Sequence, residues 1–462
     1  MRAFKRMLLA LITDFSFAEI LFSKYIRPFC RSASNFISII LGGLVNSLFE
    51  KVVKPLARRF VPRNVRTKLR SLDGKIFFRA SMRRREFQLV AMRDVPFERK
   101  IDADVSIFPE VKVDCAVPRV FPSELKSNIS LAAESYIFPA VSVLNIADAR
   151  ISSLSNFVEL KGEVVHHDLY RFTHDYTSEE LHGRIKIYPQ RKSIKKIDAA
   201  SKVEVLDVAA VFTDSCAPNY AHWLTEVLPR IHAGVEAGLS ESVPFVIDSG
   251  LHSNIFSSAK LLAEKHRLIE LQKESSLHVN NLYMVGSAGY IPFDRRPSLR
   301  DDYSHGMFSS VALKSMKAKL SSLLGPAGAE YPKKIILRRN SGARAMKNEE
   351  RLALLLQDMG FSAVYPEKLT FEQQYHLFSG AECVVGATGA AMANLIFCQP
   401  SCRVIICISS HKSHSFGYWV NMASAVDNNI TYVMGPVVGP RNQGIHADFV
   451  IDVNDVVKAI NY

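Results

Sequence analysis

Paired cysteine motifs, long apolar runs and internal repeats are all missing from this chain of 462 residues. Its seven cysteines form no pair of CxxC motifs, which argues against a cysteine-held zinc site, and their odd number favours a reducing compartment over a disulfide framework. The longest apolar stretches, residues 7–12 and 36–49, are shorter than the roughly 18–20 apolar residues that a membrane-spanning helix needs. No small-residue cleavage site follows the first stretch, so we expect no secretory signal and a cytoplasmic location.

Acidic residues are scarce at the start of the chain. Residues 1–70 contain 14 Lys and Arg but only three acidic residues, whereas the two signs nearly balance over the rest. This composition predicts a basic amphipathic helical arm over 1–70 that lies on an anionic membrane surface, at the inner face of the membrane. Packing of the arm on its own domain or on a second subunit is the alternative. Nucleic acid is not an expected partner, because the arm has no recognisable nucleic-acid-binding fold.

Alternating strand and helix patterns fill the C-terminal half. Strands are predicted at 333–337, 363–365, 383–385, 403–408, 430–434 and 449–453, with helices between them. Such repeats predict an α/β fold with a doubly wound parallel sheet. This pattern begins near residue 244, after short strands and turns, with strands predicted at 244–248, 268–271 and 281–285 and a helix at 257–266. We therefore expect an acceptor-side domain over 71–325, a donor-binding domain over 326–450 and a final helix over 451–462.

A strand followed by a glycine-containing turn lies at residues 382–397, ECVVGATGAAMANLIF. Gly386 and Gly389 break the apolar run, and small residues then begin a helix. Backbone N–H groups at a helix start attract anions, and glycine lets a ligand approach the backbone closely, so this turn predicts a phosphate site. A tight turn that binds nothing is the alternative.

Polar residues also follow the neighbouring predicted strands. Arg338 and Arg339 follow 333–337, a loop carrying Arg344 comes next, and Glu367 follows 363–365. Ligands bind parallel sheets outside the carboxyl ends of the strands, so these residues and the 386–389 turn should converge on one crevice.

Residues 214–232, DSCAPNYAHWLTEVLPRIH, predict a helix that Asn219 caps and Pro229 bends or ends. His222 and Glu226 are one turn apart on one face, where either could take a proton from a hydroxyl. The alternative is a surface ion pair beside a buried Trp223. A predicted strand at 101–108 carries Asp102 and Asp104 in a DxD pattern, for which a metal role is not favoured.

Three motifs, in this order, resemble glycosyltransferase family 61, whose members occur among capsule and exopolysaccharide gene products and eukaryotic secretory-pathway transferases. They are NYAHWLTEVLPRI, LRRNSGARAMKNEE and PEKLTFEQQYHLFSGAECVVGATGAAMANLIFCQP, within residues 207–436. The resemblance implies two Rossmann-like lobes in a GT-B-like arrangement, inversion at the sugar and no metal. Where the family usually has His, this chain has Thr388, which can donate a hydrogen bond but cannot be charged, so the donor site should be altered or less active.

The resemblance also assigns roles. His222 or Glu226 would be the catalytic base, three arginines and the Gly389 turn would stabilise the leaving diphosphate, and Glu367 would hold the ribose. The expected donor-binding set is Arg338, Arg339, Arg344, Glu367, Gln373, Gly386, Thr388, Gly389 and Asn394. Three of these residues could instead have structural roles. Arg338 could hold the end of the sheet, Glu367 could be a helix-entry residue, and Gln373 could cap a helix.

We therefore expect a hexosyl- or pentosyltransferase of capsule or exopolysaccharide biosynthesis. It would use no cofactor, take a nucleotide-sugar that is UDP-linked as substrate, and act on a glycan or lipid-linked glycan. A non-catalytic sugar-nucleotide-binding partner in a polysaccharide assembly complex is the main alternative. A pyruvyl or phosphosugar transferase of similar fold and a membrane-bound structural protein are less favoured, because the HWL helix and the polar strand ends respectively argue against them.

Overall fold

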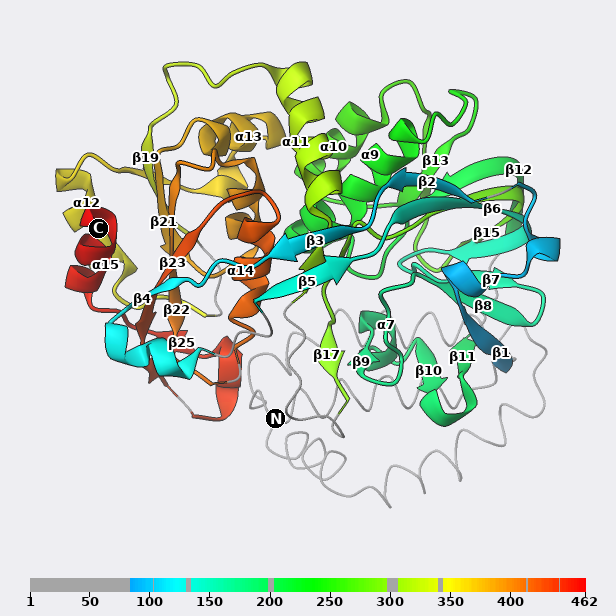
Figure 1. Ribbon diagram of the computed structural model, residues 1–462, viewed down its shortest axis with the longest axis horizontal. Helices are drawn as coiled ribbons and strands as arrows, with labels where there is room; N and C mark the ends of the chain where they lie inside the picture. The colour runs from blue at the N-terminus through cyan, green and yellow to red at the C-terminus, as the bar shows by residue number, and fades with distance from the viewer. Residues whose placement is uncertain are drawn as a thin grey trace, which may run out of the picture. The chain divides into compact units, whose positions relative to one another are not determined.

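A computed structural model describes residues 84–462 except 103, 130–133, 198–202, 297–305, 340–343, 413 and 440 (Figure 1). The basic arm predicted over 1–70 lies outside the described residues. Within the described part, no helix combines the length and apolar character that crossing a membrane demands.

The first of two main sheets is mixed and has eleven strands. The four strands at one end of this sheet, β15, β12, β13 and β14, are parallel, and β6 pairs antiparallel with β15. The strand order is β10 (Ile185–Tyr188), β11 (Ser193–Ile197), β1 (Arg84–Ala91), β8 (Glu163–His166), β7 (Val158–Leu160), β6 (Val141–Ser152), β15 (Ser276–Val285), β12 (Val203–Val211), β13 (Phe245–Asp248) and β14 (Leu268–Leu271), with β2 (Val105–Phe108) paired to β6.

The helices of this half are α7 (Ser178–Leu181), α8 (Tyr220–His222), α9 (Leu228–Glu236), α10 (Ser253–Ala263) and α11 (Ser310–Leu324). The strands predicted at 244–248, 268–271 and 281–285 are confirmed as β13, β14 and the end of β15. Helix α10 begins earlier than the predicted 257, because the His252 side chain accepts a hydrogen bond from the Asn254 N–H and caps the helix there.

The prediction of a strand over 101–108 is wrong for its first half, since β2 begins at Val105. Asp102 instead accepts a hydrogen bond from Asn145 Nδ2 at 2.8 Å, and Asp104 pairs with Lys100 Nζ at 2.7 Å. Side-chain bonds therefore take up both carboxylates of the DxD pattern.

The second main sheet has six strands, and all neighbouring pairs are parallel. Its order is β20 (Ser362–Val364), β19 (Lys334–Leu337), β21 (Cys383–Ala387), β22 (Arg403–Ser409), β23 (Ile430–Gly435) and β4 (Arg119–Phe121). The first five were predicted, whereas β4 comes from far earlier in the chain. The strand predicted at 449–453 shrinks to β25 (Asp448–Phe449), because Asp452 caps α15 (Val453–Asn461).

The remaining helices of this half are α12 (Glu349–Asp358), α13 (Phe371–Ser379) and α14 (Gly417–Ser424). Short strand pairs complete the structure: β3 (Val111–Asp114) with β5 (Ser135–Phe138), β9 (Asp175–Tyr176) with β17 (Asp294–Arg295), β16 (Gly289–Tyr290) with β18 (Met307–Phe308), and β24 (Val437–Val438) with β25. The 3-10 helices are Met92–Asp94, Phe97–Arg99, Ser123–Asn128, Pro189–Arg191, Pro366–Lys368, Ala390–Phe397 and Arg441–His446.

One hydrophobic core extends across both sheets. Phe212 and Phe245 of the first half belong to the same buried cluster as Val384 and Ile406 of the second. Figure 1 shows the two sheets on opposite sides of the molecule, with α9, α10, α11 and α13 along one edge. The described residues accordingly belong to one compact unit.

Candidate active site

The helix that was predicted from Tyr220 is confirmed, but its middle is wider than an α-helix. Asn219 Oδ1 accepts a hydrogen bond from Ala221 N at 3.0 Å and caps α8. A π-helical turn, Trp223–Val227, then leads directly into α9. The Trp223 side chain is fully buried and donates from Nε1 to Ser258 Oγ at 2.8 Å. Single π turns inside helices frequently occur at functional sites.

Pro229 was predicted to bend or end this helix, and the second of these is wrong, because α9 continues to Glu236. Proline cannot donate to the carbonyl four residues before it, which here belongs to Thr225. Gly289 packs directly against that carbonyl, and a Cβ at Gly289 would overlap the Thr225 oxygen. The π turn therefore accommodates the proline and brings the β16 backbone close to the helix.

His222 and Glu226 form a hydrogen-bonded pair within this segment. His222 Nδ1 lies 2.5 Å from Glu226 Oε2, and Glu226 Oε1 accepts a hydrogen bond from the Ile291 N–H. Only 14% of the His222 side chain and 11% of the Glu226 side chain are exposed. The pair is therefore not the surface ion pair that was the alternative.

The shared environment raises the pKa of both groups. Burial raises the pKa of Glu226, and the neighbouring His222 opposes this only in part. Burial alone would lower the pKa of His222, but the charge and hydrogen bond of Glu226 outweigh it, so its pKa is also raised. A buried carboxylate and imidazole that compete for one proton can accept a proton from a substrate hydroxyl.

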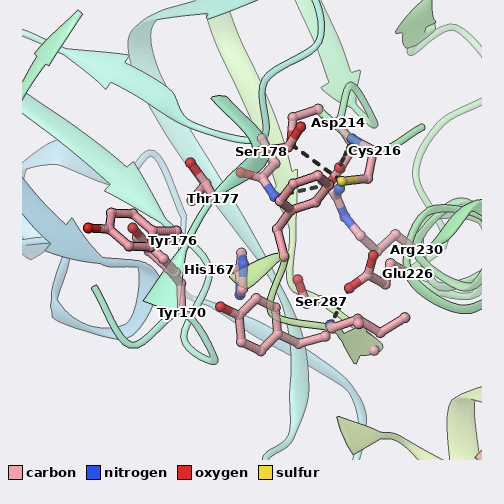
Figure 2. A pocket seen from close by; sticks show the side chains of 16 residues that line it. His167, Tyr170, Tyr176, Thr177, Ser178, Asp214, Cys216, Glu226, Arg230 and Ser287 are labelled. Atoms are coloured by element: carbon pink, nitrogen blue, oxygen red, sulfur yellow. Dashed lines mark hydrogen bonds between the residues drawn. The ribbon is translucent and has the colours of Figure 1, made fainter. Parts of the chain in front are cut away.

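A cavity with an empty volume of about 520 Å³ opens beside this pair, and we call it the Glu226 cavity. Figure 2 shows Glu226 and Arg230 from the helix at one side, facing a wall that contains His167, Tyr170 and Tyr176.

Arg230 is the buried cation of the Glu226 cavity. Its guanidinium donates to the Val285 and Val211 carbonyls at 3.2 and 3.1 Å, which fixes it at the ends of β15 and β12. Burial lowers its pKa, while the carboxylates of Asp214, Glu226 and Asp248 act in the opposite direction. Two cavity carboxylates, Asp214 and Glu226, thus face one arginine.

A second cavity, of about 780 Å³ of empty volume, adjoins the first and reaches Ala390. We call it the Ala390 cavity. Four residues line both cavities: Ser178, Ser215, Cys216 and Phe293. The two spaces therefore lead from Glu226 to the start of the 3-10 helix Ala390–Phe397, which the sequence had predicted as an ordinary helix after the glycine turn.

Two of the three predicted arginines lie together beside this turn. Arg339 Nη1 donates to the Thr388 carbonyl at 2.9 Å, and a Cβ at Gly389 would lie 3.0 Å from the same nitrogen. Burial lowers the pKa of Arg344, and the charge of Arg339 lowers it further. Neither guanidinium forms an ion pair within the described residues. Two neighbouring, half-buried cations without a paired carboxylate are suited to an anion.

Arg338 is not part of this pair. Its Nε donates to Glu349 Oε2 at 2.8 Å and its Nη2 to Glu350 Oε2 at 2.5 Å. These bonds tie the end of β19 to the first turn of α12. The structure thus places Arg338 in the structural setting that was its alternative.

Thr388 is buried and directs its side chain away from solvent. Its Oγ1 accepts a hydrogen bond from Trp419 Nε1 at 3.1 Å. The adjacent Tyr418 is also buried. Burial raises the pKa of its hydroxyl most, the charge of Glu226 raises this pKa further, and the charge of Arg344 lowers it. Tyr418 therefore lies within the electrostatic influence of both halves of the site.

Two other predicted donor residues lie in α13 and in the turn before it. Gln373 forms the predicted capping box with Thr370: its Oε1 accepts from the Thr370 N–H at 2.9 Å, and its own N–H donates to Thr370 Oγ1 at 3.2 Å. Glu367 is exposed in the turn Pro366–Lys368, and its charge acts on Arg339.

Asn394 and Gly386 lie in the interior. Asn394 Nδ2 donates to Gln374 Oε1 at 2.8 Å, and Asn394 Oδ1 accepts from the Tyr220 hydroxyl at 2.9 Å. It thereby links the second half of the chain to the helix that carries His222. A Cβ at Gly386 would lie 2.9 Å from the Leu337 Cβ, so glycine allows β21 and β19 to pack.

Several cavity residues were not predicted. Asp214 and Arg230 lie at the ends of the motif around His222, and their charge within that motif was an available signal. His167 follows β8, in a region without a recognisable motif, and no pattern in the sequence indicated it. No group of three or more His, Cys, Asp and Glu residues in the described part of the chain is arranged to hold a metal ion.

The family model described as Glycosyltransferase 61 matches residues 220–405. The match begins at the first residue of α8, ends within β22 and includes every predicted site residue. Comparison with curated proteins finds no match to the chain. The motifs, the family match and the clustered polar residues agree, and residues 220–405 match the glycosyltransferase 61 family, which supports a glycosyltransferase.

Proposed function

We propose that this protein moves a sugar, with inversion, from a UDP-linked donor to a hydroxyl of a glycan or lipid-linked glycan, without a metal ion. The observation that carries the proposal is the path of two adjoining cavities from the buried His222–Glu226 pair to the turn beside Arg339 and Arg344. Such a path offers an acceptor a base at one end and a leaving group an anion site at the other.

The transfer is a single displacement. The acceptor oxygen attacks the anomeric carbon and forms the new glycosidic bond while its proton passes to the His222–Glu226 pair. The bond from the anomeric carbon to the diphosphate oxygen breaks, and the diphosphate leaves with the electron pair. The raised pKa of Glu226 suits this role, because a base works best when its pKa is near the operating pH.

Arg339 and Arg344 stabilise the leaving diphosphate in this proposal. Their guanidinium groups offer charge-assisted hydrogen bonds at the position where negative charge develops. Backbone amides of the turn at Gly389 can add to this, and Thr388 holds the turn against Trp419. Arg338 does not contact the diphosphate in this proposal. Its bonds to Glu349 and Glu350 hold the end of β19, which Arg339 follows.

The two sheets supply the lobes of a GT-B-like arrangement, with the acceptor on the first and the donor on the second. The arm over 1–70 attaches the enzyme to the cytoplasmic face of an anionic membrane, where lipid-linked acceptors for capsule or exopolysaccharide are presented. Flotation of the full chain and of a chain lacking 1–70 with anionic vesicles tests the attachment, and equal recovery of the two would refute it.

The transfer itself is tested with purified protein and a panel of nucleotide sugars, by thermal shift and by release of nucleotide with and without EDTA. A donor at a hundredfold excess over its dissociation constant should stabilise the fold by about 2.7 kcal/mol. UDP-sugars should shift the melting temperature most, and nucleotide release should persist in EDTA. Binding without any release or transfer would instead favour the non-catalytic partner.

A further inference from the structure

His167 lies just after β8, in the wall of the Glu226 cavity (Figure 2). Its side chain is among the buried polar groups, with 7% of the residue exposed. The ring packs against Tyr290, with the ring centroids 4.9 Å apart. Its Nδ1 is buried without a hydrogen-bond partner in the described structure. Buried polar atoms are nearly always paired, so an unpaired one beside a cavity indicates a missing ligand atom.

The chemistry of this ring defines what it can bind. Burial lowers the pKa of His167 well below its ordinary value, and the charges of His166 and Arg230 act in the same direction. At neutral pH the imidazole is therefore uncharged, with one nitrogen that donates and one that accepts. A hydroxyl group, which also both donates and accepts, is the matching partner.

The rest of the cavity wall is suited to a sugar ring. Tyr290 presents an aromatic ring whose hydroxyl is held by Asp175 Oδ2 at 2.9 Å, and Phe293 stands exposed where the two cavities meet. Aromatic rings pack against the apolar faces of sugars, and the carboxylates of Asp214 and Glu226 can accept hydrogen bonds from sugar hydroxyls. His222 is already bonded to Glu226, and Arg230 is the one Lys or Arg side chain in the described lining of the cavity, so a negatively charged sugar would meet like charge and is disfavoured.

We propose that the Glu226 cavity is a subsite for an uncharged sugar ring of the acceptor, and that His167 binds one of its hydroxyls. This assignment rests on the proposed transfer reaction. It adds the substrate class, a neutral rather than an acidic sugar, and a binding residue outside the family motifs.

The decisive variant is His167→Phe, which keeps an aromatic ring against Tyr290 but removes both nitrogens. The matched control is His232→Phe on α9. His232 is also buried, with 1% of the residue exposed. Its Nδ1 has no hydrogen-bond partner in the described structure and its Nε2 bonds Ser315, but it lines neither cavity. Full-length proteins are compared for acceptor KM, for donor hydrolysis without acceptor and for melting temperature.

His167→Phe should raise the acceptor KM about tenfold, as the loss of a hydrogen bond to the ligand predicts, with donor hydrolysis unchanged. The control should change neither. Gln supplies both a donor and an acceptor, so His167→Gln should recover part of the affinity. An unchanged acceptor KM in His167→Phe would overturn the assignment, as would an equal loss of donor hydrolysis.

A second measurement needs no variant. Saturation-transfer NMR on the wild-type protein should detect methyl glycosides of neutral hexoses or pentoses, and not methyl glucuronide. Preferred binding of the glucuronide would refute the inference even if donor hydrolysis is normal. Conversely, neutral-sugar binding in a protein that neither binds nor hydrolyses any nucleotide sugar would retain the subsite and refute the transfer.

Discussion

Glu226→Gln tests the base directly. The Gln side chain has the same shape, and its carbonyl can still accept from the Ile291 N–H, so the fold should be kept. The substitution removes the negative charge that raises the pKa of His222. Loss of a positioned base typically reduces a rate by about 10² to 10⁴, which is about 3 to 5 kcal/mol of barrier. Transfer should fall by that factor, while donor affinity stays within about threefold.

The pH dependence supplies a second readout. In the wild type, transfer should decline as the pH falls through the raised pKa of the pair, because the protonated pair cannot accept a proton. Glu226→Gln removes the negative charge that raises the pKa of His222, so this pKa should fall. The residual activity should therefore stay constant down to a lower pH than in the wild type. Initial rates from pH 5 to 9, at saturating donor, measure this shift.

The chain contains a matched control. Glu372 and His376 on α13 have the same spacing as the active pair, with Glu372 Oε1 and His376 Nε2 3.8 Å apart. However, 65% of the Glu372 side chain is exposed, and neither residue lines the Glu226 cavity or the Ala390 cavity. Glu372→Gln should leave transfer unchanged. If Glu226→Gln retained more than about a third of wild-type transfer, with an unshifted pH profile, the base would lie elsewhere.

Three further predictions follow from the contacts. Arg339→Ala should weaken binding of a nucleoside diphosphate by tenfold or more, as calorimetry would show, whereas Arg338→Ala should lower the melting temperature and leave that affinity within about threefold. Asn394→Leu leaves two buried partners unpaired and should lower the urea-derived free energy of unfolding by about 3 kcal/mol; a loss below about 1 kcal/mol would contradict the bridging role. Burial raises the pKa of Asp248 to about 7, so the native state holds an extra proton between about pH 4 and 7 and loses stability as the pH rises through that window. The stability of the wild type relative to Asp248→Asn should therefore decrease by about 2 to 3 kcal/mol from pH 5 to 8 in denaturant titrations, and a pH-independent difference would refute this.

The second sheet was largely predictable, because its strands are short apolar runs with clear glycine, proline and capping signals at their ends. Thr370 and Gln373 formed the expected cap, and the 383–385 run became β21. The first sheet was harder. Many of its strands pair antiparallel or with partners distant in the chain, and propensity alone does not specify such partners.

The candidate site, too, was only partly predictable from the sequence. The pairing of His222 with Glu226 was predictable from spacing, because residues four apart share a helix face. The division between Arg338 and Arg339 was not, since adjacent residues after a strand diverge and only tertiary contacts decide which one meets Glu349. His167 could not be found at all, because its significance depends on an unpaired atom and a cavity, neither of which has a sequence pattern.

The pairing of β4 with β23 affects how the protein folds during synthesis and where it can be divided into fragments. During synthesis β4 leaves the ribosome long before β23, so the second sheet can be completed only when almost the whole chain has emerged. A fragment or chimaera that begins after α11, at residue 325, lacks β4 and leaves one side of β23 unpaired and able to pair with another molecule. Chimaeras that exchange donor specificity between relatives should therefore carry residues 119–121 together with the C-terminal half.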